Sequence, residues 1–212
     1  MASEEAGRVV GLYQRKAAEW IESRARAGSL EKPGFEKPWF ERPWLDRFRA
    51  LLPPASSILD LGCGSAEPMA AYLIGLGHPV TGVDSSPAMI DACPMRFSEQ
   101  ESIVSDMRAL ALGRAFAGIL AWDSFFHLCH EDQRRMFPLF GAHAEHGAAL
   151  MFTSGPAHGE AIGDFAGEPL YHASLDAAEY RSLLDRNGFR VVSHVVEDPE
   201  CGGHTVWLAQ RM

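Results

Sequence analysis

A glycine-rich turn and the acidic residues near it carry the clearest chemical signal in the sequence. Gly62 and Gly64 follow the apolar run Ser57–Leu61, and the absence of side chains lets a ligand approach the backbone closely. Asp84 comes about twenty residues later, after a second apolar run, where a carboxylate can accept hydrogen bonds from two ribose hydroxyls. Ser85 follows it. The pattern predicts a site for a nucleotide-like ligand, against the alternative of an ordinary tight turn and a helix-capping Asp84.

Two further acids distinguish between classes of nucleotide ligand. Glu67 stands where a dinucleotide fingerprint requires glycine or alanine, and its carboxylate would repel a pyrophosphate. Asp60 comes directly before the turn. A ligand that carries an ammonium and a sulfonium is instead attracted by acidic groups and backbone carbonyls. The acids therefore favour a cationic adenosyl cofactor over a nicotinamide dinucleotide.

Three short motifs resemble those of the class I S-adenosylmethionine-dependent methyltransferases: Asp60–Gly64, Val83–Asp84 and Ser105–Met107. The similarity covers roughly Trp44 to the C-terminus, and the combined motifs are specific for the cofactor but not for the substrate. It implies an α/β, Rossmann-like sheet of seven mostly parallel strands, with helices on both faces and an antiparallel last strand. It also implies S-adenosyl-L-methionine as cofactor and S-adenosyl-L-homocysteine as product.

The resemblance assigns roles to individual positions. In that family the glycine loop lines the methionine part of the cofactor, and the acid after the second strand holds the ribose. The acid after the third strand reaches the adenine amine, and the next residue lies against the ring. The family's third glycine is replaced here by Ala66. The predicted cofactor-binding residues are Asp60, Gly62, Gly64, Asp84, Ser85, Asp106, Met107 and Asp123.

The segment Leu120–Leu128 corresponds to the part of such enzymes that faces both the cofactor and the acceptor. Asp123 is predicted to hold the cofactor ammonium or to orient an acceptor. His127 is predicted to act as a general base if the nucleophile is a hydroxyl, and the alternative is a pocket-lining or helix-start residue bonded to the backbone. Further candidates for the surroundings of the sulfur are His158, Tyr171, His172 and Trp207.

The elements that position these residues alternate along the chain. From Ser56 onward, apolar runs alternate with helical patterns, as expected of a parallel sheet covered by helices on both faces. Strands are expected at 57–61, 80–83, around 103, 118–122, 148–153, 189–196 and 205–209, and helices at 44–52, 68–76, 87–92, from 131 and at 174–186. Pro138 is expected to kink or break its helix, and Ser174 to cap the last one. Because the connection Asp198–Gly203 has no helix, the last strand is expected to be antiparallel.

Two segments outside this alternation are expected to border the site. Residues 1–43 are predicted to pack on or cap the active site of a methyltransferase domain spanning 44–212. They comprise one amphipathic helix around Val9–Ile21, ended by Gly28, and an irregular aromatic connector at Lys32–Pro43. Ser154–Ala173 is predicted to be a long loop with little structure, either an acceptor-covering lid or a mobile surface loop.

Charge and composition limit the classes of molecule that the protein is expected to bind. The formal net charge of −9 over 212 residues disfavours nucleic acid and fits a small neutral or cationic acceptor. We expect no membrane segment and a cytoplasmic location, because no apolar run approaches about 20 residues and the first residues do not form a signal peptide. The four cysteines are expected to be reduced, and the histidine pairs lack zinc-ligand spacing, so no metal is expected.

Methyl transfer from S-adenosylmethionine to a small molecule is therefore the leading hypothesis. Two alternatives stay open at this point. One is an NAD(P)-dependent oxidoreductase on the same type of sheet, which Glu67 disfavours. The other is a non-catalytic S-adenosylmethionine-binding partner protein, which fold analogy alone does not exclude.

Overall fold

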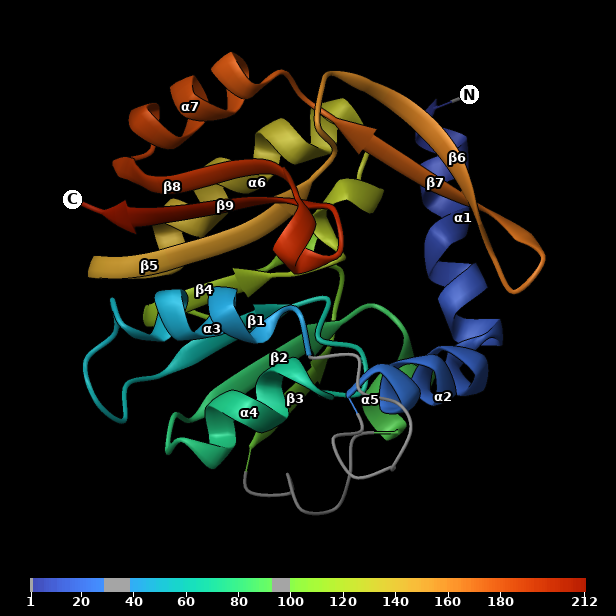
Figure 1. The fold of residues 1–212 in the computed structure, drawn as a ribbon, viewed down its shortest axis with the longest axis horizontal. Coiled ribbons are helices and arrows are strands. Elements are labelled where there is room, and N and C mark those ends of the chain that lie inside the picture. The colour runs from blue at the N-terminus through green and yellow to red at the C-terminus, as the bar shows by residue number, and fades with distance from the viewer. Residues whose placement is uncertain (1, 29–38, 93–99) are drawn as a thin grey trace.

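The computed structural model describes residues 2–28, 39–92 and 100–212, and its central feature is a seven-stranded sheet (Figure 1). The strand order is β3-β2-β1-β4-β5-β9-β8. The strands are β1 (Ile58–Leu61), β2 (Val80–Asp84), β3 (Glu101–Val104), β4 (Phe116–Ala121), β5 (Ala144–Ser154), β8 (Phe189–Asp198) and β9 (His204–Arg211). Strand order reverses between β1 and β4, which is the position where open α/β sheets bind ligands.

The strand directions match the expectation from the sequence. Strands β1 to β5 pair in parallel, and β9 pairs antiparallel with both β5 and β8. The helices are α1 (Ala2–Arg15), α2 (Ala17–Gly28), α3 (Arg42–Arg49), α4 (Met69–Gly75), α5 (Pro87–Asp91), α6 (His130–His143) and α7 (Ala177–Arg186). The predicted α/β architecture with an antiparallel last strand is therefore confirmed.

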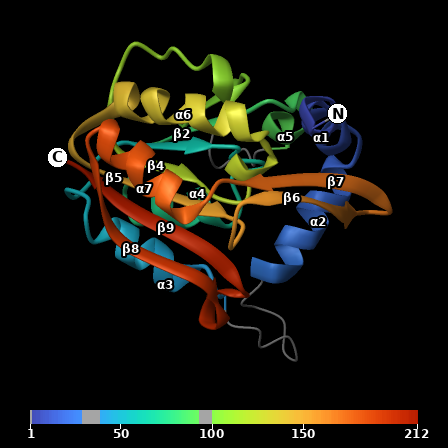
Figure 2. The same cartoon turned by 90° about the horizontal axis from the view of Figure 1, so that it is seen from above.

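Helices cover the sheet on both faces. Trp44 and Phe48 of α3 and Leu73 of α4 pack on one face, whereas Phe137 of α6 and Tyr180 of α7 pack on the other. Seen from above, α6 and α3 lie on opposite sides of the strands (Figure 2). Each central strand is buried on both faces, which explains why its sequence is a continuous apolar run. No helix among the described residues is long and apolar enough to cross a membrane.

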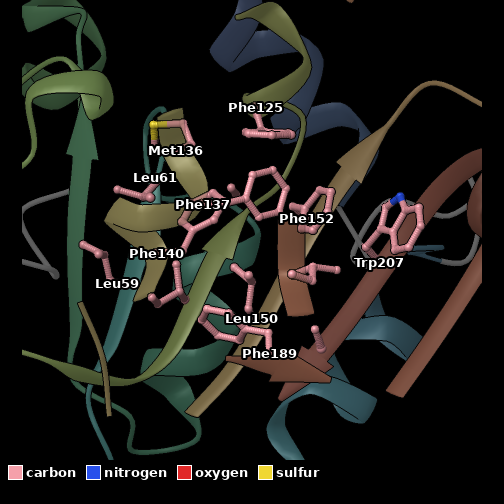
Figure 3. Packing of buried hydrophobic residues seen from close by; sticks show 14 of the residues in the cluster. Leu59, Leu61, Phe125, Met136, Phe137, Phe140, Leu150, Phe152, Phe189 and Trp207 are labelled. Atoms are coloured by element: carbon pink, nitrogen blue, oxygen red, sulfur yellow. The ribbon is translucent and has the colours of Figure 1, made fainter. Parts of the chain in front are cut away.

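An aromatic cluster ties the site to the core. Phe125, in the short 3₁₀ helix Phe125–His127, is fully buried, and its ring lies 5.2 Å from that of Phe152. The rings of Phe137 and Trp207 continue the cluster (Figure 3). Because Phe125 is anchored in this way, its neighbours Ser124 and His127 have fixed positions at the end of β4.

The N-terminal segment forms two helices, so the prediction of a single one was wrong. The break falls at Lys16, between α1 and α2, and the two helices run in different directions (Figure 1). Val9 and Leu12 of α1 pack against Leu170, whereas Trp20 of α2 reaches the glycine turn. A straight helix of this length would extend about 40 Å and could not contact both surfaces. The second helix ends at Gly28, as predicted.

The segment expected to be an irregular loop is a β-hairpin, which corrects the prediction for 154–173. It consists of β6 (Gly159–Phe165) and β7 (Glu168–Ser174), joined by Ala166 and Gly167, which both have positive φ angles. β6 is mostly exposed and has little apolar alternation, so the sequence gives a weak strand signal. β7 holds the hairpin in place by burying its apolar side chains against α1.

Two helix details also differ from expectation. Of the kink or break expected at Pro138, the break does not occur: helix α6 continues through Pro138, and Met136, Phe137 and Phe140 on either side are buried in the core, which compensates for one lost backbone hydrogen bond. Helix α7 is capped by Asp176, which accepts a hydrogen bond from the Ala178 amide, and not by Ser174. Of the predicted aromatic connector, only residues 39–43 lie within the described part of the chain, and Cys93 also lies outside it.

Candidate functional site

The turn after β1 passes so close to Ser124 that it requires glycine. Gly62 has a φ of +75°, and a Cβ at this position would lie 2.2 Å from Cβ of Ser124. Its amide donates a 2.7 Å hydrogen bond to the Val83 carbonyl, which fixes the turn against β2. Gly64 and Ala66 also have left-handed φ angles, of +54° and +68°. Because Gly62 and Gly64 have no side chains, the backbone of the turn is accessible to a ligand at these two positions.

Asp84, at the end of β2, is held rigidly by backbone amides. Its Oδ2 accepts a 3.0 Å hydrogen bond from the Gly64 amide, and its Oδ1 accepts a 2.8 Å bond from the Ser86 amide. Burial raises the pKa of this carboxyl, and these hydrogen bonds oppose the rise. Each carboxylate oxygen has a second acceptor position, so both can still receive a ligand hydroxyl.

Asp60 is a buried acid beneath the glycine turn. It is only 4% exposed, and burial, together with the nearby charge of Asp84, raises its pKa to about 7. Asp84, together with Asp60 in its ionised form, gives the turn a negative local potential. That potential favours a ligand with positive charge.

These residues border one pocket at the carboxyl ends of β1, β2 and β4. Its empty volume is about 800 Å³, part of it open to solvent. The predicted site residues that line it are Gly62, Gly64, Asp84, Ser85, Asp106, Met107, Asp123 and His127. Ala6, Val10 and Tyr13 of α1 and Trp20 of α2 form the opposite wall. The structure therefore brings most of the predicted residues together in one pocket.

Asp106 and Met107 follow β3 and contribute polar and apolar surface. The Asp106 carboxylate is paired with the Arg108 guanidinium, with Nε 3.0 Å from Oδ1, and this pairing lowers the pKa of Asp106. Arg108 also contacts Asp132 at 2.8 Å. The sequence did not predict this pairing. It fixes the orientation of Asp106 and occupies part of its capacity to accept hydrogen bonds.

His127 is buried and makes two hydrogen bonds that define its tautomer. Its Nδ1 lies 2.8 Å from the Tyr171 carbonyl, so Nδ1 must carry the proton and donate. Its Nε2 lies 3.0 Å from the Tyr13 hydroxyl and accepts from it. Burial lowers the pKa of His127 to about 4, so the ring is neutral at pH 7. Burial raises the pKa of Tyr13, which keeps the phenol protonated.

Asp123 lies at the end of β4 in a strained backbone conformation with a φ of +48°. Its amide donates to Oγ1 of Thr153 at 2.9 Å, and its Oδ1 lies 3.0 Å from Nε2 of His204. Burial opposes the charge on His204, but the contact with Asp123 outweighs it and raises the pKa of this histidine. The ring of His204 stacks on Trp122 at 5.4 Å. Asp123 is therefore held in place from two sides.

The N-terminal helices are attached to the pocket by specific polar contacts. Oε1 of Gln14 accepts hydrogen bonds from the Ser86 hydroxyl at 2.8 Å and from the Ala88 amide at 3.1 Å. Together with the bond from Tyr13 to His127, these contacts hold α1 over the ends of β2 and β4. The surface of α1 that packs there is apolar, which excludes water from part of the pocket.

Some of the further candidates lie elsewhere. Trp207 is buried in the core, stacked on Phe152 at 5.9 Å, and His158 stacks on His130 at 4.5 Å beside the hairpin. His172 packs against His127, with ring centroids 5.0 Å apart, and Tyr171 contributes its carbonyl to His127. Within the described residues, no group of three or more His, Cys, Asp or Glu side chains is arranged to hold a metal ion.

Sequence reasoning missed Tyr13, Trp20 and His204 as site residues. Tyr13 and Trp20 lie within the amphipathic pattern around Val9–Ile21, and a helical repeat does not show which surface it will cover. His204 lies 81 positions beyond Asp123 and just ahead of a predicted strand. No local signal in the sequence connects it with the site.

Comparisons with known proteins agree with this geometry. A family model described as a methyltransferase domain matches residues 58–146, which include β1, β2 and β4. The uncharacterized methyltransferase YodH of Bacillus subtilis (strain 168) is 30% identical over 163 residues, covering 69% of this chain. The chain spans 66% of that relative's length, slightly less than two thirds.

Solved structures share the fold over nearly the whole chain. The S-adenosylmethionine-bound amino pentose methyltransferase CalS10 of Micromonospora echinaspora has 19% identity and a TM-score of 0.68, covering 91% of this chain and 97% of that one. The magnesium protoporphyrin IX methyltransferase of Synechocystis PCC 6803 has 16% identity and a TM-score of 0.67, covering 96% and 97%. The family model identifies a methyltransferase domain in residues 58–146, and the sheet topology and these structures show that the chain has the fold of class I S-adenosylmethionine-dependent methyltransferases.

Proposed function

We propose that this methyltransferase transfers the methyl group of S-adenosylmethionine to a small-molecule acceptor from the pocket at the ends of β1, β2 and β4. The observation that carries the proposal is the carboxylate of Asp84. It is fixed by two backbone amides at the end of β2 and still has acceptor positions for two ribose hydroxyls. Glu67, close to the same turn, argues against a pyrophosphate ligand and so against a nicotinamide cofactor.

The residues present suit an adenosyl cofactor. Gly62 lets the turn pack directly against Ser124, where any Cβ would clash, and both residues line the pocket. In the proposed arrangement, Asp84 holds the ribose, and Asp106 and Met107 border the adenine. Asp60 and Asp123 provide negative potential for the cationic end of the cofactor, and Ser85 also lines the main pocket.

The chain's contribution to the reaction is alignment and exclusion of water. S-adenosylmethionine, when bound, supplies an electrophilic methyl group on a sulfonium sulfur. Methyl transfer by in-line displacement depends mainly on proximity and orientation. We propose that the N-terminal part, residues 1–43, caps the domain formed by 44–212, because α1 and α2 form one wall of the pocket.

We propose that His127 takes part in proton transfer through Tyr13. The Nε2 lone pair of His127 is occupied by the Tyr13 hydroxyl, so an acceptor cannot reach it directly. A proton that leaves an acceptor hydroxyl would pass to the Tyr13 oxygen as the Tyr13 proton moves to Nε2. Since the pKa of His127 is about 4, this route suits a hydroxyl that becomes strongly acidic as its oxygen is methylated. Asp123 would stabilise the resulting imidazolium by its charge.

Charge supports a small molecule rather than a nucleic acid as acceptor. The net charge of −9 repels phosphate backbones. Two of the similar structures are named for small-molecule acceptors, an amino pentose and magnesium protoporphyrin IX. The cytoplasmic location expected from the sequence stays a prediction.

A two-part experiment tests this function. In the first part, thermal unfolding is followed with S-adenosylmethionine, S-adenosylhomocysteine or NADH. We expect stabilisation by the two adenosyl ligands and none by NADH. In the second part, S-adenosylhomocysteine formation is measured with panels of small hydroxyl and amine compounds and with nucleic acid. Turnover with nucleic acid alone would contradict the proposed acceptor class, and adenosyl-ligand binding without turnover by any panel would favour a non-catalytic binding protein.

A further inference from the structure

A second hollow adjoins the proposed cofactor pocket on the side of the glycine turn. Its empty volume is about 400 Å³, part of it open to solvent. It shares four residues with the main pocket: Trp20, Gly62, Gly64 and Asp123. The two spaces therefore meet at the glycine turn, and a ligand in one can extend into the other.

The charges around this hollow have both signs. Asp60, Glu67 and Asp123 supply three carboxylates, and Arg24 of α2 is the one basic side chain that lines the hollow among the described residues. Arg24 gives the hollow a cationic group that can face an anionic part of a ligand. The pattern matches a zwitterion, in which an ammonium faces the acids and a carboxylate faces the arginine.

Arg24 is fixed in place before any ligand arrives. Its guanidinium lies 2.8 Å from Oε1 of Glu41, which is 1% exposed, and 5.9 Å from the centroid of the Trp20 ring. A guanidinium has five N–H donors, and a contact with one carboxylate uses at most two. Glu41 can therefore hold the side chain while other donors remain for a ligand.

A buried donor in the same hollow supports this interpretation. Trp122 is 5% exposed, and its indole N–H has no hydrogen-bond partner among the described residues. Buried N–H groups are rarely unpaired in native proteins, so such a group indicates a missing partner. Trp122 and Arg24 both line the hollow, and a carboxylate could accept hydrogen bonds from both.

We infer that Arg24 is a positioning residue that binds the carboxylate of the amino-acid part of the cofactor. Trp122 would donate a second hydrogen bond, and the acids would face the ammonium. This inference rests on the proposed function, because it takes the adenosyl part to lie in the main pocket. It gives α2 a specific role in ligand recognition beyond covering the site.

Calorimetry with two ligands tests the inference. S-adenosylhomocysteine carries the amino-acid part, and 5′-methylthioadenosine lacks it. Arg24→Gln is expected to weaken S-adenosylhomocysteine binding roughly 10- to 100-fold, because charge-assisted hydrogen bonds are lost, and to change 5′-methylthioadenosine binding less than about threefold. Arg8→Gln is the matched control, since Arg8 belongs to α1, is mostly exposed and does not line either space.

A second variant addresses the buried charge that Arg24→Gln leaves behind. The double variant Arg24→Gln/Glu41→Gln removes both charges of the pair and should retain the fold, with the same selective loss of S-adenosylhomocysteine binding. Equal weakening of both ligands, or no weakening of either, would overturn the role of Arg24. If the wild-type protein bound 5′-methylthioadenosine and S-adenosylhomocysteine equally well, the inference would fail while the adenosyl site stood. If it bound neither, the proposed function would fail together with the inference.

Discussion

Replacement of Gly62 by alanine should show how closely the glycine turn approaches β4. An added Cβ would lie 2.2 Å from Cβ of Ser124 and 2.8 Å from its Oγ. Favourable carbon–carbon contacts are about 3.5–4.0 Å, so the turn or Ser124 must move by more than about 1 Å. Overpacking of this kind costs roughly 1–3 kcal/mol. The φ of +75° adds about 1–2 kcal/mol, because alanine is strained in the left-handed region.

Gly77 provides a matched control for the backbone contribution. It has a φ of +88°, and a Cβ there would have no atom within 4 Å. Gly77→Ala should therefore show only the conformational cost, about 1–2 kcal/mol. Urea denaturation of both variants gives the free energy of unfolding, and the difference between them isolates the steric contribution. We expect Gly62→Ala to be less stable than Gly77→Ala by roughly 1–3 kcal/mol.

A compensating substitution makes the test specific. Ser124→Gly removes the two atoms that the new Cβ would approach to less than 3 Å, although it also deletes the hydrogen bond from Ser124 Oγ to the Leu61 carbonyl at 2.6 Å. In a double-mutant cycle, Gly62→Ala should cost roughly 1–3 kcal/mol less in the Ser124→Gly background than in the wild type. Equal destabilisation by Gly62→Ala and Gly77→Ala, or the absence of coupling with Ser124, would refute the close approach on which the cofactor pocket depends.

Two buried titrating groups predict opposite pH dependences of stability. Burial lowers the pKa of His127 to about 4 from an ordinary value of 6.5. The neutral ring therefore makes its full contribution to the free energy of unfolding above pH 6.5, and this contribution is lost as the pH falls toward 4. Wild type should lose about 2 kcal/mol more than His127→Asn between pH 7.5 and pH 5 in urea denaturation, and equal losses would contradict the burial of His127. The pKa of Asp60 is raised from 3.8 to about 7, so the free energy of unfolding decreases as the pH rises from about 4 to about 7. Asp60→Asn should be more stable than wild type, with a difference that grows by about 2–3 kcal/mol from pH 5 to pH 8, whereas a constant difference would mean that Asp60 is ionised throughout.

Most of the sheet could be predicted from the sequence because buried parallel strands have a distinctive pattern. Ile58–Leu61 and Val80–Val83 are short apolar runs, each followed by polar or glycine residues, and both are strands. Residues that follow such strands must meet at one edge of the sheet. For this reason Gly62, Asp84 and Asp123 could be assigned to one site without a structure.

The parts that could not be predicted depend on contacts between distant segments. The hairpin β6–β7 is stabilised by α1, which precedes it by about 150 positions, and β6 has little apolar alternation of its own. The contact between Asp123 and His204 crosses 81 positions, and the bond between Tyr13 and His127 crosses 114. Local patterns give the type of an element, but they do not show which surface an N-terminal helix will cover.

The neutral state of His127 also follows from such distant contacts. Its sequence position after β4 predicted either a general base for an acceptor hydroxyl or a pocket-lining residue bonded to the backbone. Tyr13 of α1 and the Tyr171 carbonyl of β7 hold both ring nitrogens. In the proposed mechanism His127 therefore accepts a proton from Tyr13 and does not contact the acceptor directly. Tyr13 therefore gives the N-terminal helix two roles: it lines the pocket, and in the proposed mechanism it relays a proton to His127.

The most direct test of the adenosyl-cofactor site is a calorimetric titration of S-adenosylhomocysteine into the wild-type protein and into Asp84→Ala. We predict one ligand per chain for the wild type. For Asp84→Ala we predict a loss of affinity of about 100-fold, because the two proposed hydrogen bonds from the ribose hydroxyls to the buried carboxylate disappear. Circular dichroism checks that the variant is folded. Absence of binding to the wild type, or equal affinity in folded Asp84→Ala, would contradict the account.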